Sequence, residues 1–464
     1  VVSPQLEPTS AVRERPTGSL PQFRNVAKEI GVDFQRFDDI STLHRIIEGN
    51  GGGVVPFSDY TDDPRLIRRN PLMCRIDVRE EVGLLLPEVR RQAGEYLNSL
   101  LPTLRRITSP LSTSCRSCEF HFPDGQLRGF HECWGEMADV TPHLLDLYYV
   151  SQAGGRNSGL ADKLIAQGKA SLFDVPTKSL ARRDGSMGEF ARRQRLQIEC
   201  IRDNREWISN ELGTVLDSLV FPLNFVDFET CNPAIPHYRG MRPFDVIAYQ
   251  WSCHTINSPG ADPQHSEWLQ SVDTYPNEAF ITGLQHRLGE EGSILIWSKY
   301  EVTVLRAIQQ QLIERDAAGS ELAAWIGRVL DSNRIVDLNQ VTLKHYFHPR
   351  AGGRTSLKVI ADAVWQSNPA IRRRLPQYVA ETEDGPLSPY QALPPLSIGD
   401  RQIAVAEGMG AVVAYYRMME RAATSATLEA AQWRRLLLQY CELDTIAMVM
   451  VWWHWHELTG QVNQ

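Results

Sequence analysis

The stretch that most constrains this chain is NFVDFET at residues 224–230, in which two carboxylates, Asp227 and Glu229, are one residue apart. A β-strand sends alternate side chains to one face, so both acids would point together above a sheet. Neighbouring carboxylates repel each other, and a hard divalent cation between them relieves that repulsion. Two solvated acids on a surface strand are the simpler alternative, but Phe225, Val226 and Phe228 make the stretch too apolar for a wholly exposed strand.

Length and charge limit the function classes. With 464 residues, 42% of them hydrophobic, the chain can bury the cores of about two or three domains. Its net charge of -8 gives no general attraction for nucleic acid, so such binding would need a local basic patch or bound metal. No run of about 18 apolar residues and no secretory start is visible. We therefore expect a soluble, cytoplasmic protein without membrane contact, and Val1 in first place leads us to expect that part of the natural N-terminus precedes it.

Composition divides the chain into four parts. Residues 1–20 are rich in Pro, Ser and Thr and are predicted to form a flexible tail. Residues 21–140 form an N-terminal region with a helix expected at 78–104, and residues 141–215 form a helical, basic linker. Residues 216–464 are expected to fold as an α/β domain. The sequence thus predicts a mainly helical, cysteine-containing region followed by a larger catalytic or binding domain.

Three cysteines are clustered in the N-terminal region. Cys115 and Cys118 form a Cys-x2-Cys pair, and Cys133 follows 15 residues later. Two cysteines close together on a turn can coordinate one metal ion. In a cytoplasmic protein such a cluster is typical of metal binding rather than of a disulfide. Three unrelated cysteines are the alternative. The fourth ligand would be an upstream Cys or one of these residues: Cys74, His121 and His131.

Arginines are concentrated just ahead of the acidic strand, in helices that carry Arg192 and Arg193. Such a run is either a solvated helix face or a wall that contacts phosphates. Arg354 and Lys358, which follow a Gly-Gly turn, are further candidates for phosphate contacts, with a solvated helix start as the alternative. These four basic residues are the predicted nucleic-acid contacts.

The C-terminal half alternates strand and helix patterns. Strands are expected at 220–228, 246–256, 266–269, 294–297 and 335–338. Helices are expected at 277–288, 301–317, 322–330, 357–365 and 428–458. Three neighbouring strands followed by alternating helices predict a mixed sheet with helices on its faces.

The last long helix carries Tyr440 and Asp444 at a spacing of four, which places both on one face. Cys441 is expected to turn away from that face. Because the helix has a core pattern, a carboxylate on its buried side needs a partner or a metal. A local hydrogen-bonded pair of Tyr440 and Asp444 is the alternative.

Two further acids follow strands. Glu301 opens a helix just after a short strand. There its negative charge would either interact favourably with the helix dipole or act as a ligand at the edge of the sheet. Asp337 ends another strand, and a turn or capping role is the better interpretation of it than metal binding.

Taken in chain order, the acidic strand, the segment that ends in Glu301 and the last helix resemble the motifs of the DEDD exonucleases. These belong to the ribonuclease-H-like superfamily, and the resemblance is to the subgroup with Tyr in its last motif. The family's first motif, Asp-x-Glu after a hydrophobic strand, matches Asp227 and Glu229. Its last motif, Tyr-x3-Asp, matches Tyr440 and Asp444. The resemblance implies a ribonuclease-H-like mixed sheet flanked by helices.

The middle motif departs from the family. There the family has Asn, a short spacer, an aromatic residue and Asp, whereas this chain has Trp297, Tyr300 and Glu301. Tyr300 fits the aromatic place, Glu301 would serve for Asp, and Trp297 replaces Asn.

A second resemblance covers most of the chain. The order of CRSCEF, GFHECWGE, FPLNFVDFET, RPFDVIAYQWS and YCELDTIAMV is similar to the bacterial domain of unknown function 2779 family. In that family a RecB/Cas4-like nuclease region with cluster-binding cysteines precedes a DnaQ-like exonuclease domain. The resemblance implies a 4Fe-4S cluster on Cys115, Cys118 and Cys133, with Zn²⁺ as the alternative. No Glu-x-Lys active-site strand of the RecB type is found in residues 1–140.

The exonuclease resemblance implies hydrolysis of phosphodiesters, of the 3′–5′ exonuclease type, by two Mg²⁺ or Mn²⁺ ions about 3.5 to 4 Å apart. Asp227 would bridge both ions, Glu229 and Asp444 would hold one, Glu301 would place the other, and Tyr440 would orient the nucleophile. A single-stranded end of DNA or RNA is the implied substrate.

Two rival functions remain. The departure in the middle motif fits a degenerate exonuclease fold that binds nucleic acid or a protein without cutting. The Trp-rich end, with Trp452, Trp453 and Trp455, would instead serve an interaction subunit of a larger nuclease or defence complex if these side chains were exposed. Completion of the core helix is the plainer role for them.

Overall fold

The computed structural model describes residues 78–121, 129–182, 184–315, 321–383, 385–393, 396–398, 401–403, 408–424 and 426–462. The predicted tail at 1–20 and Cys74 lie outside these ranges. The chain divides into two compact units, Val1–Thr108 and Ser109–Gln464. In the first unit, α3 (Arg79–Leu100) confirms the helix expected at 78–104.

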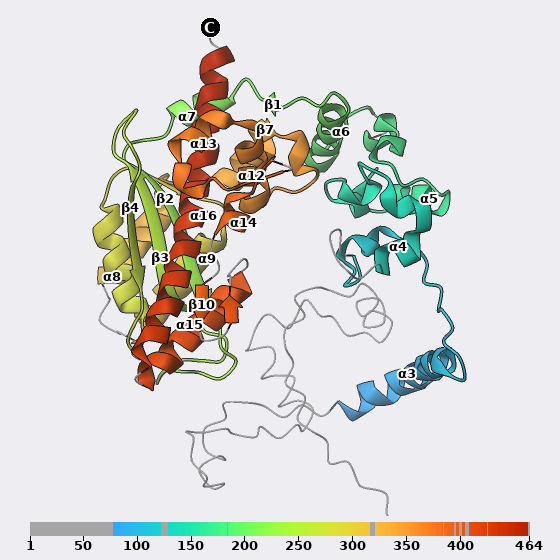
Figure 1. Ribbon diagram of the computed structural model, residues 1–464, viewed down its shortest axis with the longest axis horizontal. Helices are drawn as coiled ribbons and strands as arrows, with labels where there is room; N and C mark the ends of the chain where they lie inside the picture. The colour runs from blue at the N-terminus through green and yellow to red at the C-terminus, as the bar shows by residue number, and fades with distance from the viewer. Residues whose placement is uncertain are drawn as a thin grey trace, which may run out of the picture. The chain divides into compact units, whose positions relative to one another are not determined.

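The second unit is built on a five-stranded sheet in the order β4-β3-β2-β5-β6 (Figure 1). Its strands are β2 (Leu223–Cys231), β3 (Ile247–Ile256), β4 (Gln264–Leu269), β5 (Ser293–Ile296) and β6 (Ile335–Asp337). β3 runs antiparallel to β2 and β4, whereas β5 runs parallel to β2 and β6. All five expected strands and the mixed sheet are confirmed.

Helices cover both faces of the sheet (Figure 1). One face packs against α8 (Asn277–Leu288), α9 (Tyr300–Arg315) and α10 (Glu321–Asp331), and this core includes Val226 and Phe228. The other face packs against α12 (Leu357–Ser367) and α16 (Thr427–Val462), around Leu223 and Phe225. Because side chains alternate along β2, Asp227 and Glu229 belong to the α16 face.

The remaining elements support this sandwich. α7 (Leu212–Asp217) contacts α16, α15 (Gly408–Ala423) packs along α16, and α11 (Leu338–His345) follows β6. Shorter elements are α13 (Pro369–Arg374), α14 (Pro389–Ala392) and two hairpins, β8 (Glu381–Thr382) with β9 (Gly385–Pro386), and β10 (Leu396–Ile398) with β11 (Arg401–Ile403).

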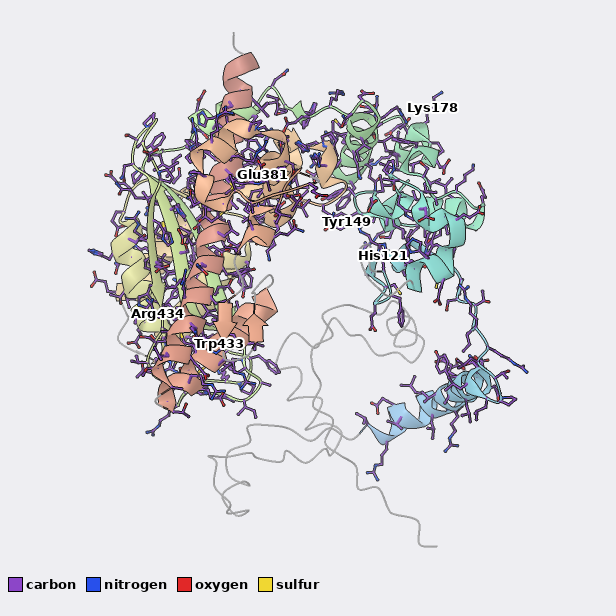
Figure 2. The ribbon with its side chains drawn as sticks, in the orientation of Figure 1. His121, Tyr149, Lys178, Glu381, Trp433 and Arg434 are labelled. Atoms are coloured by element: carbon purple, nitrogen blue, oxygen red, sulfur yellow. The ribbon has the colours of Figure 1, made fainter. Side chains whose placement is uncertain are left out.

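α16 is the central helix of this unit. It is long and apolar enough to cross a membrane by length and composition, but 78% of its most apolar window is buried inside the protein. Trp433 near its start is buried, and so are Trp452, Trp453 and Trp455 near its end (Figure 2 labels Trp433). The three Trp residues near the end of the helix therefore complete the core. The exposed aromatic cluster that would favour an interface is not present there.

The described residues between 109 and 206 form a small helical layer with its own core. Its helices are α4 (Gly129–Trp134), α5 (Leu160–Ala166) and α6 (Glu189–Arg202), joined by short 3-10 turns. The layer is tied to the sheet side by close backbone contact, because a Cβ at Gly353 would come within 2.0 Å of the Asp146 carbonyl oxygen. Directly after it, β1 (Trp207–Ile208) pairs with β7 (Tyr346–Phe347), so the chain passes into the α/β domain without a free linker.

Candidate metal centre

Two of the acids reach the site from β2. The strand forms because apolar residues alternate with polar ones, and Val226 and Phe228 fill the core beneath it. Asp227 and Glu229 consequently point to the face that α16 covers. Gln250, the β3 residue opposite Glu229, donates a 3.0 Å hydrogen bond to the Leu437 carbonyl and so helps to hold the helix over the acids.

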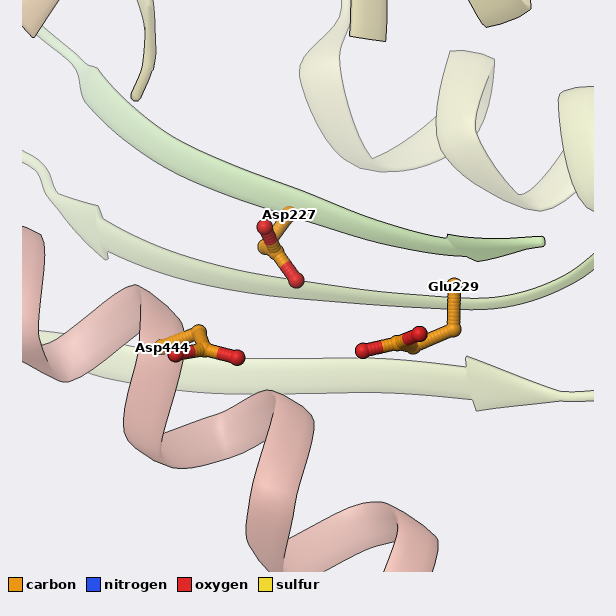
Figure 3. Close-up of side chains that lie close together, drawn as sticks. All are labelled: Asp227, Glu229 and Asp444. Atoms are coloured by element: carbon orange, nitrogen blue, oxygen red, sulfur yellow. The ribbon is translucent and has the colours of Figure 1, made fainter. Parts of the chain in front are cut away.

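Asp444 reaches the same place from α16. One carboxylate oxygen from each of Asp227, Glu229 and Asp444 lies within 4.8 Å of the other two (Figure 3). In the part of the chain that the structure describes, no other set of three His, Cys, Asp or Glu side chains lies this close together. The two outer motifs, whose acids Glu229 and Asp444 are 215 residues apart in sequence, thus meet at one point.

Burial and mutual repulsion dominate the electrostatics of this group. Burial, followed by the charges of Asp444, Glu301 and Glu229, raises the pKa of Asp227 well above its ordinary value. Burial and the charge of Asp444 raise the pKa of Glu229 to about 8, and burial raises the pKa of Asp444 to about 6. Without a cation, the folded protein therefore favours protonation of acids that would be ionised in water.

The donor set fits a hard divalent cation. All three converging ligands are carboxylates, and Mg²⁺ and Mn²⁺ prefer such oxygens. The raised pKa values follow first from the burial of these carboxylates and, for Asp227 and Glu229, also from the neighbouring negative charges. Asp227, Glu229 and Asp444 are thus the residues that would hold a metal ion.

Glu301 is a fourth buried acid beside this group. It lies in the first turn of α9, and its Oε2 has no hydrogen-bond partner among the described residues. Burial raises its pKa to about 8, and Asp337 and Asp444 also raise it. An orphaned buried carboxylate oxygen is costly unless something binds it, which supports a ligand role over a simple interaction with the helix dipole. Glu301 does not belong to the tight set of three.

The other two residues of the middle motif have structural contacts. The Trp297 indole N–H donates to the Thr355 carbonyl at 3.0 Å, and the Tyr300 hydroxyl pairs with the Thr230 hydroxyl. Trp297 therefore anchors the loop before α12. Asp337 accepts a 3.1 Å hydrogen bond from the Gln340 amide at the start of α11, so its expected capping role is confirmed.

Lys358 enters the site from α12. Its Nζ donates a 3.0 Å hydrogen bond to the Tyr440 hydroxyl and lies 4.9 Å from the centre of the Tyr440 ring. Its charge lowers the pKa of Glu229 and of Asp444 against the effect of burial. Lys358 is therefore part of the carboxylate site, which differs from the solvated helix start weighed for it.

Tyr390 is a site residue that sequence reasoning missed. Its hydroxyl donates a 2.6 Å hydrogen bond to Asp444 Oδ1, and Lys358 Nζ lies 5.3 Å from its ring centre. It is on the short helix α14, in a stretch without periodicity or motif. No local signal in the sequence could have placed it there.

The expectation that Cys441 turns away from the site is wrong. Its thiol donates a hydrogen bond to Asp227 Oδ2, with the sulfur 3.6 Å from that oxygen. The physical reason is that α16 lies directly on β2, so the contact face of the helix is wide enough to include the residue beside Tyr440. Burial raises the pKa of Cys441 well above its ordinary value, so the group is a neutral thiol.

The cysteine segment does not assemble a comparable group in the described residues. Cys118 and Cys133 are exposed and Cys115 is half-buried, and all three are free thiols. His121, labelled in Figure 2, places its Nδ1 3.2 Å from the Arg116 carbonyl and packs on Phe130. His131 pairs with Asp139 instead. Residues 122–128, between the thiols, lie outside the described ranges.

The four predicted basic contacts fall in different environments. Arg193 is buried, and its Nη1 donates to the carbonyls of Tyr346 at 2.6 Å and Thr342 at 3.3 Å. It ties α6 to β7 and has no free face for a phosphate, which corrects the prediction for this residue. Arg192 and Arg354 are exposed.

Among the comparisons with known proteins, a family model matches part of the chain. No curated protein and no solved structure matches the chain at a significant level. Residues 224–356, which carry Asp227, Glu229 and Glu301, match the family model described as a domain of unknown function (DUF2779). This part of the chain is thus similar to the DUF2779 family.

Proposed function

We propose that this protein is a metal-dependent nuclease that removes nucleotides from single-stranded DNA or RNA, in the manner of a DEDD exonuclease with Tyr in its last motif. The observation that carries the proposal is the convergence of Asp227, Glu229 and Asp444 from β2 and α16, with the orphaned Glu301 carboxylate beside them. This arrangement of acids is suited to holding the cations that phosphodiester hydrolysis requires.

The metal supplies, when bound, positive charge for the attacking and leaving oxygens of the phosphodiester. The side chains of the chain have separate tasks. Tyr390 fixes the carboxylate of Asp444 through its hydrogen bond. Lys358 fixes the Tyr440 hydroxyl and adds a positive charge beside the acids.

Tyr440 acts as a neutral hydroxyl in this proposal. Burial and the charges of Asp444, Glu229 and Asp227 raise its pKa, so the phenol keeps its proton at neutral pH. Because Lys358 occupies an acceptor position on the phenol oxygen, the hydroxyl proton is free to orient a water molecule or a substrate oxygen. Tyr440 thus positions the nucleophile and does not act as a base.

The direct test is nucleotide release from 5′-labelled and 3′-labelled single-stranded DNA and RNA, in Mn²⁺ and in EDTA. We expect shortening in Mn²⁺ with wild type, none in EDTA, and none with Asp227→Asn. Glu278→Gln is the matched control, because it removes one negative charge from an exposed position on α8 across the sheet. It should leave the rate unchanged.

A second function is favoured by one specific observation. The place of the family's Asn is taken by Trp297, whose indole is committed to the Thr355 carbonyl. A site altered in this way could bind nucleic acid or a partner protein without cleavage. Metal-dependent binding of labelled single strands without any shortening, by a protein shown to be folded, would establish that function and refute the nuclease.

A further inference from the structure

The three converging carboxylates differ in the hydrogen bonds that they accept (Figure 3). Asp444 accepts one from the Tyr390 hydroxyl at 2.6 Å, and Asp227 accepts one from the Cys441 thiol at 3.6 Å. Among the described residues, no group donates a hydrogen bond to Glu229. Carboxylates that ligate a metal are usually held by hydrogen bonds of their own. A donor directed at Glu229 would complete the pattern.

An irregularity in the sheet lies beside Glu229. The pairing of β2 with β3 shifts between Glu229 and Thr230, because Gln250 is opposite Glu229 whereas Ala248 is opposite Thr230. Tyr249 is therefore an extra residue of β3, and the strand forms a β-bulge at this point. Bulges beside active sites often change the direction in which a side chain points.

The bulge turns two successive residues of β3 to the face that α16 covers. Tyr249 packs in the core formed with α15 and α16, and the Gln250 amide donates to a carbonyl of α16. Their neighbours Ala248 and Trp251 lie in the core on the opposite face. Strict alternation would have sent Tyr249 and Gln250 to opposite faces. The bulge thus places the phenol of Tyr249 on the side of the sheet that carries the acids.

The Tyr249 hydroxyl is a buried donor without a partner. The residue is 0% exposed, and its hydroxyl oxygen has no hydrogen-bond partner among the described residues. The ring is stacked on that of Tyr415, with the ring centres 4.1 Å apart and the ring planes at 9°, so its orientation is fixed. An unpaired buried hydroxyl is costly, and most such groups in proteins have a partner. The hydroxyl is therefore available to a group of the neighbouring site.

Glu229 is the acid that acts on this phenol. Burial raises the pKa of Tyr249 above its ordinary value, and the charge of Glu229 is the next cause. The phenol consequently keeps its proton at neutral pH and can donate it in a hydrogen bond. The stacked partner differs in this respect. The pKa of Tyr415 is raised by burial and then by Tyr238 and Cys231.

We propose that Tyr249 is a positioning residue of the metal centre, whose hydroxyl donates a hydrogen bond to the Glu229 carboxylate when that carboxylate binds a cation. The inference rests on the proposed function, since it concerns the same carboxylate site. The hydrogen bond satisfies the buried hydroxyl and restricts the rotation of Glu229. Tyr249 then does for Glu229 what Tyr390 does for Asp444.

The test measures Mn²⁺ binding to the full chain, without substrate, by electron spin resonance of the free ion. Wild type is compared with Tyr249→Phe, which deletes the hydroxyl and keeps the ring. Tyr415→Phe is the matched control, because it deletes a hydroxyl from the other ring of the same stack. We expect Tyr249→Phe to bind Mn²⁺ roughly tenfold more weakly and Tyr415→Phe to bind it as wild type does. The thermal midpoint in EDTA shows that both variants are folded.

A second comparison separates positioning from packing. If Tyr249 acts through Glu229, Tyr249→Phe should cause no further loss of Mn²⁺ affinity in a Glu229→Ala background. The same loss in that background, or equal weakening by both tyrosine variants, would assign the effect to packing and overturn the proposal. Mn²⁺ binding by Tyr249→Phe at wild-type strength would also overturn it.

The outcomes also separate this inference from the proposed function. A wild type that binds no Mn²⁺ would overturn both. Weakened binding in Tyr249→Phe, together with no release of nucleotides by wild type, would support the role of Tyr249 and refute the nuclease.

Discussion

The carboxylate site and the cysteine segment differ in what holds their ligands in place. Asp227 and Asp444 project from a nine-residue strand and a 36-residue helix that are packed on each other. Cys115 belongs to a five-residue 3-10 turn and Cys133 to a six-residue helix. Asp227 and Asp444 are held in place by extended backbone hydrogen bonding and a shared core. Cys115 and Cys133 lie on short elements, which constrain the orientation of their side chains less.

This difference has an energetic side. The carboxylates are forced together by packing and repel each other, which is the condition of a preorganised cation site. The exposed thiols carry no comparable strain, since water solvates them. The rate and the free energy of unfolding should therefore depend strongly on substitutions in the acidic site and on its ionisation. Substitutions in the cysteine segment should change them little, unless ligands outside the described residues join it.

After Asp227→Asn, the largest effect is expected from Glu301→Gln. If Glu301 serves as a ligand, the loss of its charge should lower the metal-dependent rate by roughly 10²-fold to 10³-fold, while the protein stays folded because a buried repulsion is removed. The measurement is single-turnover release of nucleotides at saturating Mn²⁺.

The matched control is Asp337→Asn. It removes a neighbouring charge but keeps an amide that can cap α11, so its rate should stay within about twofold of wild type. Equal loss in both variants would assign the effect to general electrostatics, and an unchanged rate in Glu301→Gln would remove Glu301 from the site.

Tyr440→Phe is expected to have the next largest effect. The change deletes one hydroxyl and leaves the carboxylates intact, so the rate should fall roughly 10-fold to 100-fold with Mn²⁺ affinity preserved. Lys358→Met should reproduce much of this loss, because Lys358 fixes that hydroxyl. A double variant no slower than the single ones would show that the two residues act as one unit, and full additivity would contradict it.

Much of the fold could be predicted from the sequence. The five strands and the helices α8, α9, α10, α12 and α16 carry strong periodic patterns, and each lies where its pattern predicts. The sequence could not reveal α15 or the pairing of β1 with β7, because these elements are stabilised by long-range packing rather than by their own pattern.

The candidate site was predictable only where side chains sit on regular elements. A strand period of two and a helix spacing of four place Asp227 with Glu229 and Tyr440 with Asp444. Tyr390 and Cys441 were missed or misplaced, because their positions depend on which elements touch α16. Arg193 looked like one of several surface arginines, and only the tertiary structure buries it against carbonyl groups.

The stability of the metal-free protein should fall as the pH rises. The pKa values of Glu229 and Glu301 are about 8 in the folded protein, against about 4.3 for an unfolded Glu. Between about pH 5 and pH 8 the folded protein holds protons that the unfolded chain has released. The free energy of unfolding therefore decreases with pH, by on the order of 1 kcal/mol per pH unit.

Urea unfolding in EDTA across that pH range measures this slope, and Mg²⁺ should flatten or reverse it because the cation replaces the protons. Glu301→Gln should reduce the slope in EDTA. An identical slope with and without Mg²⁺ would mean that the carboxylates bind no cation.

The smallest effect is expected from Cys118→Ser. Because Cys118 is exposed and none of the described ligating groups gathers around it, the change should alter the free energy of unfolding by no more than about 0.5 kcal/mol and leave the nuclease rate unchanged. The check is unfolding together with the iron and zinc content of protein purified without oxygen, with Cys200→Ser as a buried control that should be more destabilising. If Cys118→Ser instead removes bound iron or zinc and costs several kcal/mol, the thiols meet ligands from outside the described residues. The two regions would then be alike, since both would be built around a metal.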